Sequence, residues 1–218
     1  NRDRPGDGSL GAMSSGYGLN AIVLAGGQSS RMGRDKALIP VQGVALLGRV
    51  CQVALKCTPL VYVVTPRVEQ YAAVVPAGCR FVPELVDPTQ PSPSGGPLLG
   101  FARGLAQVQT EWVLLLACDL PRLKAASLQQ GIASLGQVGA EIALLPKTVK
   151  GWEPLCGFYR ASCLTDLQAA IGAGERSFQG WLAGQQVKEL VLKNPAMLFN
   201  CNTPADLVLL NTQIPNNP

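Results

Sequence analysis

Short runs of uninterrupted apolar residues alternate along this chain with longer stretches that contain polar residues. Such runs are typical of strands that are buried on both faces of a parallel sheet. The runs predict strands at 19–25, 60–65, 112–118 and 141–146. The stretches between and after them predict helices at 45–57, 68–75, 97–107, 125–135, 162–171, 178–182 and 204–211. Strands that alternate with crossover helices indicate an α/β fold.

The pattern predicts a single domain over residues 19–213. We expect three layers, αβα, around a mostly parallel, twisted sheet of the Rossmann-like kind. Residues 1–18 are rich in glycine and lack periodicity, so we expect a disordered lead or a remnant of cloning there, and a flexible tail at 214–218. Ligands of such sheets bind beyond the carboxyl ends of the strands, so the segments that follow the apolar runs are the places to search.

Composition narrows the classes of function. Hydrophobic residues make up 47% and charged residues 15% of the 218 residues, which favours a compact globule over a disordered chain. Histidine is absent, which excludes imidazole bases, Ser/His/Asp and Cys/His triads and HExxH zinc sites. The net charge of +4 is not gathered into Lys/Arg tracts and aromatic residues are 6%, so no nucleic-acid partner is expected.

The seven cysteines are spread along the sequence and form no CxxC pair. We expect reduced thiols in the core and therefore a cytoplasmic protein, because an oxidising compartment would leave one of the seven unpaired. The apolar runs fall short of the roughly 20 residues that cross a bilayer, so no membrane span is predicted.

The segment after the first predicted strand carries candidate chemistry. Gly26 and Gly27 let the backbone approach a ligand closely and present consecutive N–H groups, which favours phosphate oxygens. Arg31 and Lys36 follow in the same loop and add two cations for a polyphosphate. The loop fits neither the GK[ST] ending of a P-loop nor the GxGxxG spacing of a dinucleotide fold. The pattern predicts a phosphate-binding loop, with a plain glycine turn as the alternative.

This loop and three later segments resemble the motifs of a known family. The run LAGGQSSRMGRDK at 24–36 is similar to the LAGGxSxRMGxDK signature of the small nucleotidyltransferases. Three further motifs match in order, namely GGPLLG at 95–100, ACDLP at 117–121 and NCNTPADL at 200–207. Together they resemble most closely the molybdenum cofactor guanylyltransferases (the MobA family). The resemblance spans nearly the whole chain between its two ends and implies a Rossmann-like nucleotidyltransferase fold.

The resemblance implies transfer of GMP from GTP, bound with Mg²⁺, to molybdopterin, with release of pyrophosphate. It implies that Lys36 holds phosphate and that backbone groups of Leu24, Ala25 and Gly26 hold guanine and ribose. Gly27 is expected to bind the nucleotide as well. The expected partners are GTP and molybdopterin, together with other proteins of molybdenum cofactor synthesis and chaperones of molybdoenzymes.

Asp119 directly follows the apolar run 112–118, which predicts that it lies at the carboxyl end of a strand and faces the glycine loop. A carboxylate beside a triphosphate is repelled unless a cation lies between them, and Mg²⁺ prefers hard oxygen ligands. We therefore expect Asp119 to hold Mg²⁺, with a helix cap as the alternative. The resemblance implies that Asp119 also contacts the nucleotide.

Catalysis is expected from positioning and charge neutralisation by Arg31, Lys36 and Asp119, without a protein nucleophile. Arg31 is expected to neutralise charge on the triphosphate. Asp35 is expected either to pair with Lys36 and Arg31 or to be an exposed loop residue.

Two positions depart from the family pattern. The family's nucleotide-contacting Asp, shortly before the GPLxG segment, corresponds to either Glu84 or Asp87, and we favour Asp87. The family's Asn after the second strand has no counterpart in VTPR at 64–67, so that contact is either lost or made through the backbone. The strictness of guanine selection therefore stays open.

The later motifs predict the acceptor side. Asn200 and Asn202 precede a predicted helix for which Thr203 is a suitable N-cap, and Asn202 is expected to reach the metal or the acceptor phosphate. The resemblance implies pterin binding near Arg176 and Ser177, with a surface arginine and a helix-capping serine as the alternative. Two other functions stay open, a molybdopterin cytidylyltransferase or other small-molecule nucleotidyltransferase, and a nucleotide-binding protein without turnover.

Overall fold

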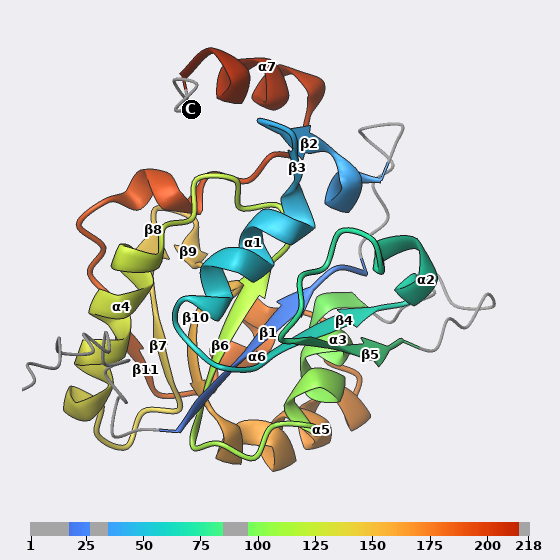
Figure 1. Cartoon of the computed structure of the whole chain (residues 1–218). Helices are drawn as coiled ribbons and strands as arrows, with labels where there is room; N and C mark the ends of the chain where they lie inside the picture. Colours follow the sequence, from blue (N-terminus) through green and yellow to red (C-terminus); the bar gives the residue numbers. More distant parts are fainter. Residues whose placement is uncertain (1–17, 27–34, 85–95, 214–218) are drawn as a thin grey trace, which may run out of the picture.

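A computed structural model describes residues 18–26, 35–84 and 96–213. Within these residues the main element is a seven-stranded sheet in the order β11-β7-β10-β6-β1-β4-β5 (Figure 1). Its strands are β1 (Leu19–Leu24), β4 (Val61–Thr65), β5 (Cys79–Pro83), β6 (Trp112–Ala117), β7 (Ala143–Leu145), β10 (Cys156–Arg160) and β11 (Val187–Glu189).

The strand directions confirm the prediction of a mostly parallel sheet. β1 runs parallel to both of its neighbours, β4 and β6, and β4 runs parallel to β5. β10 is antiparallel to β6 and to β7, and β11 is parallel to β7, so β10 alone of these seven strands opposes the rest. The carboxyl ends of β1, β4 and β6 therefore meet at one edge of the sheet.

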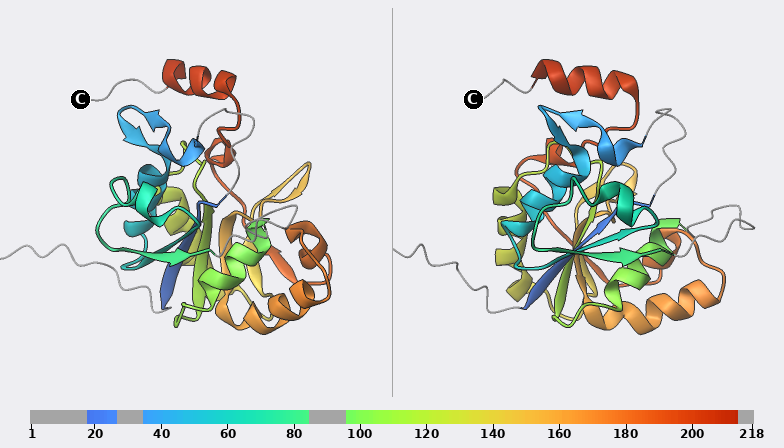
Figure 2. Two further views of the ribbon diagram at one scale, coloured as in Figure 1. Left: turned by 90° about the vertical axis from the view of Figure 1, so that its right-hand side faces the viewer. Right: turned by 45° about the vertical axis from the view of Figure 1, so that its right-hand side comes forward.

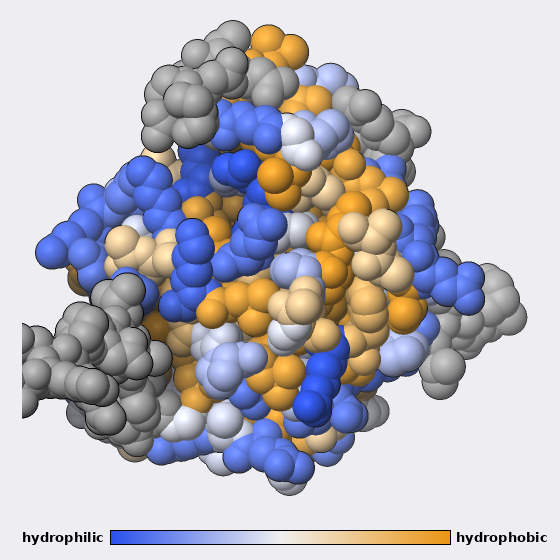
Figure 3. Space-filling model, viewed as in Figure 1, coloured by the Kyte–Doolittle hydropathy of each residue, from blue (hydrophilic) through white to orange (hydrophobic). Residues whose placement is uncertain are grey.

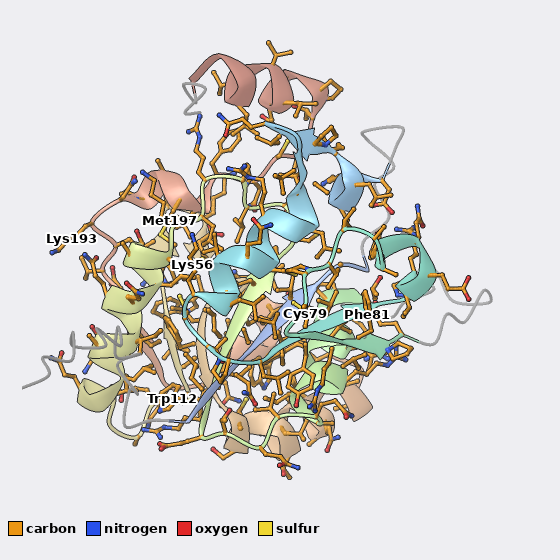
Figure 4. All side chains as sticks on the ribbon, in the orientation of Figure 1. Lys56, Cys79, Phe81, Trp112, Lys193 and Met197 are labelled. Carbon is orange, nitrogen blue, oxygen red and sulfur yellow. The ribbon has the colours of Figure 1, made fainter. Side chains whose placement is uncertain are left out.

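Helices cover both faces of the sheet and complete the predicted three layers (Figures 1 and 2). One face packs against α1 (Leu46–Leu55) and α4 (Ala125–Ser134), with Met197 of a short 3-10 helix on the same side (Figure 4). The opposite face packs against α3 (Gly96–Leu105), α5 (Leu164–Gly172) and α6 (Phe178–Leu182).

Residues of β1 alternate between the two apolar cores, which explains why the run has no polar face. Ala21 and Val23 belong to the core on the α1 side, whereas Ile22 belongs to the core on the α3 side. Both faces of the strand are thus buried, as its sequence predicted, in which Asn20 is the one polar residue.

A third, small apolar cluster lies at the end of the molecule toward which β1 and β6 point. It joins the hairpin of β2 (Pro40–Val41) and β3 (Val44–Ala45) to α7 (Pro204–Gln213), through contacts that include Val41 and Leu210. α7 therefore rests on the hairpin, away from the two main layers of helices (Figures 1 and 2). This packing brings the segment before α7 to the edge where the strands end.

The remaining described elements are short. They are α2 (Val68–Tyr71), the hairpin strands β8 (Lys147–Thr148) and β9 (Gly151–Trp152), and the 3-10 helices η1 (Lys36–Leu38), η2 (Leu135–Gln137), η3 (Ala161–Cys163) and η4 (Pro195–Leu198). The helix predicted at 68–75 is thus limited to a single turn of α2. Among the described helices none is long and apolar enough to cross a membrane.

Two of the strands that the sequence did not predict, β5 and β10, differ in composition from the buried runs. β5 is an edge strand with partly exposed residues, among them Cys79 and Phe81 (Figure 4), so it lacks an uninterrupted apolar pattern. β10 is interrupted by Gly157, where a Cβ atom would lie 3.0 Å from the Leu144 carbonyl oxygen of β7. Glycine weakens the strand pattern there because the neighbouring backbone approaches closely.

On the side viewed in Figure 1, the described residues form both hydrophilic and apolar areas, and apolar residues gather right of the centre (Figure 3). Hydrophilic residues gather toward the left of this view, and polar and apolar residues are mixed near its centre (Figure 3). This distribution is ordinary for the surface of a folded domain.

Close packing of α3 on the sheet gives a testable prediction. A Cβ atom at Gly104 would lie 2.9 Å from methyl groups of both Ile22 and Val64. Gly104→Ala is expected to lower the free energy of unfolding by about 1–3 kcal/mol, because the overpacked helix must shift. Urea denaturation measures the change.

Gly172→Ala at the end of α5 is the matched control, because a Cβ atom there would meet nothing within 4 Å. Its stability is expected to stay equal or to rise slightly, since alanine favours a helix more than glycine does. Equal destabilisation by the two substitutions would contradict the packing described here.

Candidate active site

The site is built where β1 and β6 end side by side. Leu24 pairs with Ala117 in the sheet, and the Cys118 N–H donates to the Leu24 carbonyl oxygen at 3.2 Å. The turn that begins with Ala25 and Gly26 and the carboxylate of Asp119 therefore leave the sheet at the same edge. The structure thus brings together the start of the predicted phosphate loop and the predicted metal ligand.

Lys36 joins this edge from the far end of the loop. Its Nζ donates to Asn202 Oδ1 at 2.6 Å and lies 3.7 Å from Asp119 Oδ2. The side chains of Lys36 and Asp119 are 20% and 18% exposed, so the pair is partly screened from water and still reachable. Three residues from separate segments, each predicted from a motif, meet at one point.

Burial destabilises the charged form of the Asp119 carboxyl group. Loss of water raises the pKa of its carboxyl group, and the positive charge of Lys36 opposes this rise. The Asp119 carbonyl oxygen accepts a hydrogen bond from the Cys201 N–H at 3.0 Å, which ties the end of β6 to the turn before α7. A partly buried carboxylate with a raised pKa and one cation beside it is typical of a functional site.

Asp35 places Lys36 through the backbone. Its Oδ1 accepts from the Ala37 N–H at 3.0 Å and so caps η1, the short helix that begins at Lys36. Its Oδ2 accepts from Tyr71 Oη at 2.7 Å and from Arg67 Nη1 at 3.2 Å. The sequence had suggested pairing with Lys36 and Arg31; the partners found here are on α2 and just before it.

Thr65 braces the turn after β1 at the place where the family pattern has an Asn nearby. It is fully buried, and its hydroxyl donates to the Ala25 carbonyl oxygen at 3.0 Å. The Thr65 hydroxyl oxygen also accepts a hydrogen bond from the Arg67 N–H at 3.1 Å. Sequence reasoning missed this role, because a threonine at the end of a strand gives no specific signal.

Glu84 lies deep in the same edge, between two glycines. Its side chain is 4% exposed, and its carboxylate occupies the space where a Cβ atom of Gly26 would project. A Cβ atom at Gly100 of α3 would lie 3.0 Å from Glu84 Oε1. Both glycines are therefore required by the close approach of this carboxylate.

Burial raises the pKa of Glu84, and Arg103, whose Nη1 lies 3.9 Å from Oε1, lowers it in part. Glu84 was the alternative to Asp87 in the sequence analysis. Asp87 lies outside the described residues, as do Gly27 and Arg31.

The other residues predicted for the acceptor are placed as follows. Arg176 Nη1 donates to the carbonyl oxygens of Ile171 and Glu175, both at 2.8 Å. Ser177 caps α6, because its hydroxyl accepts from the Gly180 N–H at 3.3 Å. Both side chains are exposed, and so is Asn200. Their contacts match the capping alternative and leave an acceptor role as a prediction.

The donor set at the edge fits a hard divalent cation. Asp119 offers partly buried carboxylate oxygens, and oxygen ligands of this kind suit Mg²⁺. Among the described residues no group of three or more Cys, Asp and Glu side chains is arranged to hold a metal. Mg²⁺ at this place would therefore take most of its ligands from water and from phosphates of a bound nucleotide, as it commonly does.

Comparison with known proteins identifies the family to which this chain belongs. The profile of the MobA-like NTP transferase domain matches residues 21–189, which include the turn after β1, Lys36, Glu84 and Asp119. The chain belongs to the MobA-like NTP transferase family. It is accordingly a nucleotidyltransferase by family, as its motifs predicted.

Relatives of this MobA-like chain agree with that assignment. It is 57% identical over 193 residues to the "Probable molybdenum cofactor guanylyltransferase" of Nostoc sp., covering 88% of this chain and 90% of the relative. It is 32% identical over 186 residues to the "Molybdenum cofactor guanylyltransferase" of Pseudomonas syringae pv. syringae, covering 84% and 88%.

Solved structures confirm the fold of the MobA-like chain. The molybdopterin-guanine dinucleotide biosynthesis protein A of Archaeoglobus fulgidus superposes with a TM-score of 0.69 at 23% identity, covering 88% of this chain and 97% of that one. A protein of Aquifex aeolicus VF5 superposes with a TM-score of 0.66 at 25% identity, covering 84% and 93%.

The environment of Glu84 predicts a pH-dependent effect on stability. Because its pKa is higher in the native state than its usual value of 4.5, stability falls as pH rises from the usual value through the raised native pKa. Glu84→Gln is therefore expected to raise the free energy of unfolding at pH 8 relative to the unchanged protein, and to have less effect at pH 5. Urea denaturation at both pH values tests this.

Glu69→Gln is the control, since Glu69 is exposed on α2 and its neutralisation should leave stability unchanged. The opposite result would contradict this account. If Glu84→Gln lowers the free energy of unfolding at pH 8 by more than it does at pH 5, the carboxylate stabilises the fold.

Proposed function

We propose that the chain is a molybdenum cofactor guanylyltransferase, which transfers GMP from GTP to the terminal phosphate of molybdopterin. The observation that carries the proposal is the meeting of Lys36 and Asp119, 3.7 Å apart, beside the glycine turn that follows β1. The 57% identity with the Nostoc protein, over nearly the whole length of both chains, supports the choice of substrates.

The reaction depends more on positioning of the two substrates than on acid–base catalysis. An oxygen of the acceptor phosphate attacks the α-phosphorus of GTP, the bond from that phosphorus to the bridging oxygen breaks, and pyrophosphate leaves with the electron pair. The acceptor phosphate is already ionised near neutral pH, so a strong general base is dispensable, which suits a chain without histidine. Alignment of the two substrates and neutralisation of their charge supply most of the rate.

Lys36 is proposed to bind the triphosphate. Its Nζ is held by Asn202 Oδ1 at 2.6 Å and faces Asp119, so the ammonium group is oriented before a nucleotide arrives. Arg31, between the glycine turn and Lys36 in the sequence, is proposed to add a second cation. Two cations would neutralise part of the negative charge that a triphosphate carries.

Asp119 is proposed to hold Mg²⁺ jointly with phosphate oxygens. When bound, Mg²⁺ neutralises phosphate charge and separates the carboxylate from the phosphates. The raised pKa of Asp119 supports this role, because a partly buried carboxylate gains from an added cation.

Guanine and ribose are proposed to lie against the backbone of the turn after β1, at Leu24, Ala25, Gly26 and Gly27. Glu84 presents its carboxylate beside Gly26 and is proposed to accept hydrogen bonds from guanine N–H groups, in place of Asp87, which was favoured on sequence. Guanine carries two adjacent donors, at N1 and N2, whereas the corresponding edge of cytosine carries one. A carboxylate here therefore favours GTP over CTP.

Molybdopterin is proposed to bind on the side of Asn200 and Asn202, with Arg176 and Ser177 as more distant candidates. The turn that carries Asn202 borders Asp119, which would bring an acceptor phosphate next to the metal. We place the enzyme in the cytoplasm, where thiols stay reduced, since all seven cysteines are free. Other proteins of molybdenum cofactor synthesis and molybdoenzyme chaperones are proposed partners.

Release of pyrophosphate tests the proposed function. The protein is incubated with Mg²⁺, molybdopterin and each nucleoside triphosphate in turn, and release with GTP alone is expected. Release with CTP alone would identify the second candidate, a cytidylyltransferase. The observation that favours this candidate is that residues 64–67 lack the Asn of the family pattern. Binding of nucleotide without release under every condition would contradict an enzyme.

Asp119→Asn is expected to abolish turnover and to leave the melting temperature nearly unchanged, because it removes a desolvated charge and keeps the shape of the side chain. Asp166→Asn on α5 is the control and should keep full activity, since Asp166 contacts Trp181 and Gln185 far from this edge. Full activity of Asp119→Asn would show that the metal is held elsewhere.

Lys36→Ala is expected to weaken binding of GTP by roughly tenfold to a hundredfold, the range for loss of a charged hydrogen bond, and to leave binding of guanosine unchanged. Isothermal titration calorimetry measures both. Lys56→Ala, at an exposed lysine after α1, is the matched control. An equal loss for GTP and guanosine would contradict the phosphate role of Lys36.

A further inference from the structure

The turn before α7 is fixed by a carboxylate that lies outside the site. Asp206 Oδ2 accepts from the N–H groups of Asn202 and Thr203, both at 2.8 Å. In return, the Thr203 hydroxyl accepts from the Asp206 N–H at 3.2 Å. This reciprocal arrangement is a capping box at the start of α7, with Asp in place of the usual Glu.

The capping box reaches one residue further back than usual. A standard box pairs the carboxylate with the N-cap residue, which is Thr203 here, whereas the same oxygen of Asp206 also holds the N–H of Asn202. Two N–H donors on one oxygen form charge-assisted bonds, which are stronger than bonds between neutral groups. These bonds lower the pKa of Asp206, so it stays anionic.

Asn202 passes this restraint to the site. Its backbone is held by Asp206, and its side-chain Oδ1 accepts from Lys36 Nζ at 2.6 Å. The preceding residue, Cys201, donates from its N–H to the Asp119 carbonyl oxygen at 3.0 Å. The turn is thus anchored on one side to α7 and on the other to both charged residues of the site.

We propose that Asp206 is a positioning residue, which holds Asn202 so that its amide oxygen orients the ammonium group of Lys36 toward the nucleotide triphosphate. The proposal rests on the proposed function for the identity of the nucleotide. Asp206 itself touches neither substrate nor metal, and it acts through two bonded neighbours. Without its carboxylate, two N–H groups lose their partner and the turn is free to move the Asn202 amide away from Lys36.

Nucleotide binding separates this role from a purely structural one. Asp206→Ala is expected to weaken GTP binding about tenfold and to leave guanosine binding unchanged, the same pattern as loss of Lys36. Asp206→Glu should restore GTP binding, because Glu serves the same position in capping boxes. Calorimetry with GTP and with guanosine gives both dissociation constants.

Ala205→Gly is the matched control for the stability of α7. It lowers the helix propensity of the exposed first turn and keeps every bond of Asp206, so GTP binding should be unchanged. If Ala205→Gly weakens GTP binding as much as Asp206→Ala does, the effect comes from helix stability and the proposal fails.

A double-mutant cycle tests whether Asp206 acts through Asn202. In an Asn202→Ala background, Asp206→Ala is expected to cause little further loss of GTP affinity, since the amide that it positions is gone. Additive losses would overturn the proposal, and so would unchanged GTP binding by Asp206→Ala alone. Because binding is measured rather than turnover, an unaltered protein that binds GTP without releasing pyrophosphate would contradict the proposed function alone.

Discussion

The pairing of Lys36 with Asp119 is the interaction on which the rest of the site depends. A parallel sheet brings the ends of β1 and β6 to one edge, and the Asp119 carboxylate is desolvated there. Lys36 offsets part of that cost, and a metal-bound triphosphate would supply an anion for Lys36 and a second cation for Asp119. This arrangement of charges supports the proposal that a metal-bound nucleotide binds here.

Most of the surrounding contacts serve to hold Lys36 in place. On one side, Asp35 caps η1 and is itself held by Arg67 and Tyr71. On the other side, Asn202 contacts the ammonium group directly. Fixing a long, flexible lysine side chain before the substrate arrives reduces the conformational entropy that is lost on binding. Several half-buried polar contacts thus orient one cation, the ammonium group of Lys36.

The sequence predicted those parts of the fold that burial makes uniform. β1, β4 and β6 are covered on both faces, and their apolar runs identified them. The edge strand β5 and the antiparallel strand β10 gave no such run, because one is partly exposed and the other contains a glycine required by its neighbour.

The site was predictable where a motif carried it and not where distant residues support it. Lys36, Asp119 and Asn202 each lie in a motif, and the structure brings them together. Arg67 and Tyr71, the partners of Asp35, are 32 and 36 residues away from it in the sequence, and no local sequence pattern predicts such contacts. The capping box was readable in principle, since Thr203 and Asp206 have the spacing that defines it.

A crystal structure with a non-hydrolysable GTP analogue and Mn²⁺ in place of Mg²⁺ tests the central claim most directly. Anomalous scattering would locate the ion without reference to any assumed ligand. The account predicts the ion bonded to the Asp119 carboxylate and to phosphate oxygens, with Lys36 Nζ on the same triphosphate. An ion and triphosphate bound away from the shared edge of β1 and β6 would contradict it.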